Sequence, residues 1–249
     1  MTSKDGETRL QRAFATEVLR GLRLGFRARL FSLGVIAVLL GVQNPFPDFV
    51  YFWALLAAFI LLVWFPYKHH QRGGSGSWHQ YAYPLGDMVL LTFMLLFPNP
   101  LSDQLTYPAP VALRFGNEIY FFILIASTVF YYSPRVVLWG GFSAALAWSA
   151  GTLWIANLPG TVFFSGGRFG DLATAEEQLA YYFQANLVNL QLLVTQCIVF
   201  MLVAAVLAVA VWRTKALVLT HAQAERLGDL TAVSGRLHEL VLKGAPREK

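Results

Sequence analysis

The chain has 249 residues, of which 56% are hydrophobic and 13% are charged, and its net charge at pH 7 is +5. An ordinary soluble domain has about 25% charged residues, so this composition indicates a membrane protein and argues against a soluble catalytic domain. The positive charge does not predict nucleic acid binding, because the basic residues flank apolar stretches instead of forming a patch on a soluble fold.

The first 29 residues predict a basic amphipathic helix. Leu10, Phe14, Val18, Leu22 and Phe26 recur every four residues, with arginines between them. This pattern is typical of a helix that lies on the inner surface of a membrane, and a solvated helical tail is the alternative. The segment does not predict a signal peptide, because it contains acidic residues and lacks a short apolar core followed by a small-residue cleavage site.

Six apolar stretches approach or reach the length of about 20 residues that a helix needs to cross a bilayer. We place them at residues 28–44, 47–67, 82–98, 116–133, 136–157 and 181–212. Ser133-Pro134 predicts a tight connection that opens the next helix with proline in its first turn. The expected fold is therefore an all-α membrane protein of six transmembrane helices. Its parts would be residues 1–29, a transmembrane domain at 30–212, and a cytoplasmic helix and tail at 213–249.

The positions of lysine and arginine predict the orientation. Of the 19 basic residues, 17 lie before the first span, in the second and fourth loops, or after the last span, whereas only Arg114 and Arg168 lie in the other loops. Basic residues are enriched in cytoplasmic loops. Both termini are therefore predicted to lie in the cytoplasm.

Polar residues inside or beside the spans are the candidates for ligand binding or signal coupling, because polar groups are costly in hydrocarbon. Asp87 lies about one turn into the third span, and both a structural partner such as an arginine and a signalling role are open for it. Arg114 and Glu118 stand four residues apart at the outer start of the fourth span, a spacing that allows an ion pair on a helix. With Asn117, they are expected at the entry of any soluble ligand.

The sixth span is the richest in polar side chains. The spacing of Asn186, Asn189 and Gln196 predicts that they share one helical face with Leu193. Amides on such a face hydrogen-bond across helix interfaces. The alternatives are that they surround a small ligand or form a dimer seam.

The sixth helix is predicted to continue into the cytoplasm, because no proline occurs between Pro159 and Pro246. In that extension, apolar residues follow the alternating three and four spacing of a coiled-coil seam. This pattern predicts a parallel homodimer, with the following dimer or transducer candidates: Leu230, Val233, Leu237 and Leu240.

No catalytic residue, metal site or cofactor is predicted. The chain lacks a phosphate-binding loop, a Gly-x-Ser-x-Gly elbow and a His-Glu-x-x-His pair. Cys197 is the only cysteine, so a disulfide framework is excluded. His69, His70 and His79 lie in or beside a Gly/Ser-rich loop, which does not preorganise metal ligands.

Several fragments between residues 82 and 225 resemble the N-terminal six-helix membrane domain of bacterial class III adenylate/guanylate cyclases. They are Asp87 with Leu90-Leu91-Thr92, Pro98-Asn99-Pro100-Leu101, Leu113-Arg114-Phe115-Gly116-Asn117, Tyr132-Ser133-Pro134-Arg135, Ala147-Trp148, and the exit helix Arg213 to Leu219 with Gln223-Ala224-Glu225. The resemblance implies a bacterial inner-membrane protein whose exit helix leads to a cytoplasmic cyclase domain that works as a dimer. Because the chain ends at Lys249, we expect that the catalytic half is absent and that cAMP or cGMP synthesis needs a domain supplied by a partner.

A second resemblance involves Leu237-His238-Glu239-Leu240, which is similar to the phosphoacceptor helix of histidine kinases. The spacing to the preceding Gly228-Asp229-Leu230 element departs from that pattern, so a solvated histidine is preferred over phosphotransfer at His238. The favoured function is a membrane sensor or anchor that passes a signal through the sixth helix to a cytoplasmic effector. A small transporter or membrane enzyme and a passive assembly subunit are the alternatives.

Overall fold

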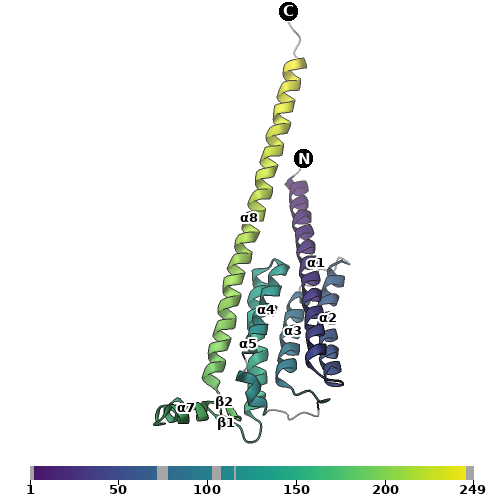
Figure 1. The fold of residues 1–249 in the computed structure, drawn as a ribbon. Helices are drawn as coiled ribbons and strands as arrows, with labels where there is room; N and C mark the ends of the chain where they lie inside the picture. The colour runs from purple at the N-terminus through teal and green to yellow at the C-terminus, as the bar shows by residue number, and fades with distance from the viewer. Residues whose placement is uncertain (1–2, 72–77, 103–107, 115, 245–249) are drawn as a thin grey trace, which may run out of the picture.

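The computed structural model describes the backbone of residues 3–71, 78–102, 108–114 and 116–244 (Figure 1). The elements in chain order are α1 (Ser3–Gln43), α2 (Asp48–Gln71), α3 (His79–Leu96), η1 (Ala109–Arg114), α4 (Ile119–Ser127), η2 (Thr128–Tyr131), α5 (Pro134–Ala156), β1 (Val162–Phe163), α6 (Gly166–Gly170), α7 (Ala175–Tyr182), β2 (Leu187–Val188) and α8 (Leu190–Gly244). The predicted all-α class is confirmed, since the strands are two residues each.

Four helical segments are long and apolar enough to cross a membrane: Arg23–Gln43, Asp48–Phe65, Pro134–Ala156 and Leu190–Leu217. These segments support a membrane protein. The segment Ile119–Tyr131 is apolar but shorter. The prediction of six spans is thus supported for four of them by length and composition, and it stays a prediction for the third and fourth.

α1 joins the predicted amphipathic segment and the first span into one helix of 41 residues. The sequence boundary between residues 29 and 30 therefore lies inside a continuous helix. The side chains of Leu10, Phe14 and Val18 lie outside the described part of the chain, so the amphipathic face stays a prediction.

The fourth predicted span is broken. α4 ends at Ser127, and the tighter 3₁₀ turn η2 follows it. The hydroxyls of Ser127 and Thr128 donate to carbonyls three residues earlier, Leu124 O at 2.7 Å and Ile125 O at 2.6 Å. Such local bonds compete with regular helix geometry. After η2, α5 begins with Pro134 in its first turn, as predicted.

The sixth predicted span begins too early in the sequence-based assignment. α7 ends at Tyr182, β2 follows, and α8 starts only at Leu190. The side-chain oxygen of Asn189 accepts hydrogen bonds from the backbone N–H groups of Gln191 (3.0 Å) and Leu192 (3.1 Å), which satisfies donors that the first turn leaves free. The predicted continuation of the helix is confirmed, because α8 is one helix of 55 residues.

The core is centred on α5, which packs against α3 on one side and α8 on the other. Trp148 of α5 and Phe200 of α8 are buried around Phe121 of α4, with ring centroids 5.4 Å and 5.2 Å from that of Phe121. Gly141 permits a close approach of α5 to α8, because a Cβ at this position would lie 2.4 Å from the Cβ of Ala204. The backbone contact between these two helices therefore requires glycine.

The two ends of the bundle differ. The N-terminal part of α1 and the C-terminal part of α8 extend beyond the bundle at the same end, which we call the terminal end (Figure 1). Residues 157–189, called the cap, contain β1, α6, α7 and β2 and lie at the opposite end. In the cap, β1 pairs in parallel with β2, and a capping box between Thr174 and Glu177 starts α7.

Candidate functional site

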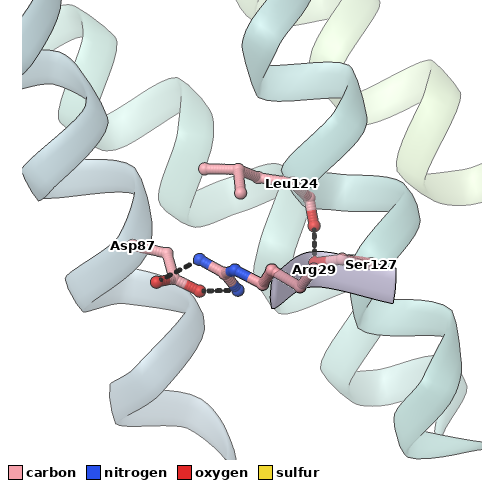
Figure 2. A network of polar contacts seen from close by, with 4 residues as sticks. All are labelled: Arg29, Asp87, Leu124 and Ser127. Carbon is pink, nitrogen blue, oxygen red and sulfur yellow. Dashed lines mark hydrogen bonds and ion pairs between the residues drawn. The ribbon is translucent and has the colours of Figure 1, made fainter. Parts of the chain in front are cut away.

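A bidentate ion pair joins α1 to α3 inside the bundle. The two terminal guanidinium nitrogens of Arg29, Nη1 and Nη2, donate to the carboxylate oxygens of Asp87, each at 2.7 Å (Figure 2). The side chains are only 15% and 10% exposed. Paired, charge-assisted hydrogen bonds of this kind are strong and geometrically specific. Asp87 therefore has the structural partner that the sequence left open, and that partner is Arg29.

A cavity of about 50 Å³ adjoins this ion pair and is bordered by residues of α1, α3 and η2, including Tyr131. The volume is sufficient for a few water molecules. The nearby hydroxyls of Ser127 and Thr128 are bonded to carbonyls of their own helix, as Figure 2 shows for Ser127 and Leu124. Arg29 and Asp87 therefore neutralise each other's charge. The ion pair joins α1 to α3, and we call it the Arg29–Asp87 lock.

η2 lies between the first helix and the last. A Cβ at Gly25 of α1 would lie 2.8 Å from the ring of Phe130 in η2, so α1 approaches η2 closely. On its other side, Val129 packs against a small apolar cluster that includes Val137 of α5 and Val211 of α8. η2 therefore contacts both α1 and α8.

Arg114, at the cap end, fastens the cap to η1. Its guanidinium donates to the carbonyl oxygens of Gln184 and Leu187, the latter at 2.7 Å. Burial lowers the pKa of Arg114, and the nearby Tyr182 raises it in part. An arginine nevertheless keeps its proton at any physiological pH, so Arg114 places a fixed positive charge beneath the cap.

The ion pair that the spacing of Arg114 and Glu118 allows on a helix does not form. Gly116 has a φ of +68°, so the chain turns between the two residues and the i to i+4 geometry of a helix does not form. Arg114 instead binds the cap carbonyls. Glu118 occupies the N-cap position of α4, and its Oε2 is buried without a hydrogen-bond partner. Asn117 donates to the carbonyl of Ala112 at 3.1 Å, which holds the turn.

The three predicted amides of the sixth span have three different positions. Asn186 lies in the turn before β2, so its predicted place on a helical face with the others is wrong. Asn189 precedes α8 and caps it. Gln196 lies within α8 and is buried, and its Oε1 accepts a hydrogen bond of 2.7 Å from Nε1 of Trp148 on α5. The expected hydrogen bonding between helices is therefore confirmed for Gln196.

A second cavity, of about 20 Å³, lies where η1, α5, the cap and the start of α8 meet. Arg114, Asn189 and Gln196 border it, together with Thr152 and Tyr182, which the sequence did not single out. Thr152 gave no signal in the sequence because an isolated threonine in an apolar helix is ordinary. The structure thus brings three of the predicted residues together, whereas Asp87 lies at the ion pair.

The remaining candidates Leu230, Val233, Leu237 and Leu240 belong to α8, but their side chains lie outside the described part of the chain. Within the described ranges, no three His, Cys, Asp or Glu side chains gather closely enough to hold a metal ion. The described polar groups fasten helices and border two small cavities. Comparisons with models of protein families, with curated proteins and with solved structures gave no match.

Proposed function

We propose that this chain is a receptor-like module of a bacterial inner membrane that passes a signal through α8 to a cytoplasmic effector. The observation that carries the proposal is the continuity of α8, which begins beside the cavity at the cap end and continues unbroken to Gly244. At a rise of 1.5 Å per residue, 55 residues span about 80 Å. The proposal includes six spans and cytoplasmic termini.

Signal transfer requires that the helices have two arrangements. A ligand then shifts the equilibrium between them only if it binds one arrangement more tightly than the other. α8 is held against α5 at three levels: by Gln196 near the cap, by the contact of Ala204 with Gly141, and by Val211 at the terminal end. Because α8 is one continuous helix, a shift at the cap end that overcomes these contacts would be passed along it. η2 offers a second input, because it links α8 to α1 and hence to the Arg29–Asp87 lock.

The proposed output is a change in the pairing of α8 within a homodimer. The apolar seam Leu230, Val233, Leu237 and Leu240 supports this part of the proposal. The resemblance to cyclase membrane domains suggests a nucleotide cyclase domain, which makes cAMP or cGMP, as the effector. A passive anchor would need no coupling between the bundle and this seam.

A helical-phase experiment tests the proposal. A class III cyclase catalytic domain is fused to the C-terminus, and insertions are placed after Thr214. Two added alanines rotate the following helix by about 200°, whereas seven alanines restore its phase to within about 20°. We expect the two-residue insertion to change cAMP production several-fold and the seven-residue insertion to preserve it. Equal cAMP production from all three fusions would favour a passive anchor.

Reporter fusions test the proposed topology. Green fluorescent protein fused at the C-terminus is expected to fluoresce, and alkaline phosphatase fused there is expected to be inactive, because the terminal end would lie in the cytoplasm. Alkaline phosphatase inserted at residues 160–178, within the cap, is expected to be active. An active phosphatase at the C-terminus would mean either an odd number of spans or an inverted orientation, and either result would overturn the assignment.

A further inference from the structure

Gln196, which borders the cavity at the cap end, carries a hydrogen-bond donor with no acceptor. Gln196 is 8% exposed, and its Nε2 is buried without a partner. The assignment of nitrogen and oxygen in this amide is fixed by Trp148, whose indole N–H can only donate and therefore faces Oε1. The part of the amide without a hydrogen-bond partner is thus its NH₂ group. Leaving such a group unpaired in a buried position is costly.

Thr152 borders the same cavity and carries a second unpartnered group. The residue is 2% exposed, and its Oγ1 has no hydrogen-bond partner. The other threonines with described side chains within α-helices donate to the carbonyl four residues earlier, as Thr92 does to Met88 at 2.8 Å. The hydroxyl of Thr152 forms no such bond and remains available to an occupant of the cavity.

The rim of the cavity is also rich in donors. Arg114 carries a fixed positive charge there, and its guanidinium can only donate. The Oδ1 of Asn189 is already used by the first turn of α8, so its NH₂ group is the part left to bind. Tyr182, which also borders the cavity, is 38% exposed. The lining therefore suits an acceptor with negative charge and not a cation.

We propose that this cavity binds the carboxylate group of a small ligand. A carboxylate accepts about four hydrogen bonds and pairs well with arginine, which matches the free donors of Gln196 and Thr152 and the charge of Arg114. A volume of about 20 Å³ has room for about one or two water-sized atoms. The carboxylate oxygens would enter the cavity, and the rest of the ligand would lie beside Tyr182. This inference deepens the proposed function, on which it rests for its biological meaning, by naming the chemistry of the signal.

Binding is measured on the full-length protein in dodecyl maltoside, which contains no carboxylate or phosphate. Sodium acetate is titrated at constant ionic strength, and the unfolding temperature is followed, because a ligand that binds only the native state raises it. We expect acetate to raise the unfolding temperature, and methylammonium and acetamide at equal concentrations to leave it unchanged. Nanodiscs with and without phosphatidylserine form a second arm, since the carboxylate could belong to a free solute or to a lipid headgroup.

Two variants remove the proposed donors. Gln196→Glu retains an oxygen for Trp148 but replaces the NH₂ group with an oxygen that repels a carboxylate. Thr152→Val removes a hydroxyl that has no partner, so it should leave folding intact or improve it. Each is expected to weaken acetate binding by about tenfold or more. Thr92→Val is the matched control, since Thr92 is buried but does not border the cavity.

The outcomes are distinct. No stabilisation of the wild type by acetate or by phosphatidylserine would show that the cavity holds water only and would overturn the inference. Equal stabilisation of the wild type and Thr152→Val would overturn it as well, even if Gln196→Glu failed to fold. Because binding is measured without any reporter, acetate binding to a chain whose cyclase fusion fails the phase test would reject the proposed function and leave this site standing.

Discussion

Replacing Asp87 with asparagine is expected to lower the free energy of unfolding by about 3 kcal/mol, because it leaves the charge of Arg29 buried without an anion. Asparagine has nearly the same shape, so little of this loss would come from packing. Thermal or denaturant unfolding in a mild detergent measures the difference. Arg27→Met is the matched control, because Arg27 is exposed on the same helix, and it should change stability by less than about 0.5 kcal/mol.

The double variant Arg29→Met with Asp87→Leu separates the pair from its surroundings. Replacing both members of a buried ion pair by apolar residues is often neutral or stabilising. We therefore expect the double variant to recover most of the stability lost by Asp87→Asn. If the double variant were less stable than Asp87→Asn, the two charges would stabilise the protein mainly through their interaction with the adjoining cavity. The pair would then not be a lock between α1 and α3.

The sequence left open whether Asp87 has a structural partner such as an arginine or a signalling role, and it did not identify Arg29. An aspartate inside an apolar helix needs neutralisation, so an arginine was an open possibility. The choice of Arg29 depends on how α1 lies against α3, and its pairing with Asp87 spans 58 residues of the chain. Several other basic residues occur in the same segment, and only the tertiary packing selects one of them.

The errors at the cap end have a common physical cause. The sequence predicts helical spacing over residues 114–118 and a helix that already includes residues 181–190. Each prediction fails at a residue that ends a helix or starts a new one. Gly116 adopts a positive φ, and Asn189 caps the first turn of α8. Both residue types were visible in the sequence. Hydropathy outweighed them, because apolar residues continue on either side of each break.

The strongest predictions concerned long-range regularity. The proline-free stretch predicted the continuous α8, and Ser133-Pro134 predicted the start of α5. The donor-rich cavity could not be predicted, because it gathers residues from η1, α5, α7 and α8. Gln196 was identified as an amide between helices, but the free state of its nitrogen depends on Trp148, which lies 48 residues earlier.

Gly141→Ala is expected to destabilise the protein by about 1–3 kcal/mol, because overfilling a packed interface forces the backbone to shift. The added Cβ would lie 2.4 Å from the Cβ of Ala204 and 3.0 Å from the carbonyl oxygen of Phe200, so α5 and α8 must separate. Gly34→Ala is the matched control. Apart from the chain neighbours and the nearby backbone of its own helix, no atom lies within 4 Å of its new Cβ. Alanine should therefore stabilise that helix by up to about 1 kcal/mol.

The same variant tests whether the contact of α5 with α8 carries the signal. In the cyclase fusion, Gly141→Ala is expected to change cAMP production, whereas Gly34→Ala is not. Ala204→Gly in the Gly141→Ala background removes one of the two close contacts and should restore part of both stability and output, since the contact with Phe200 persists. If Gly141→Ala lowered stability but left cAMP production unchanged, α8 would be anchored by α5 without being moved by it, and a signal would have to enter through η2 instead.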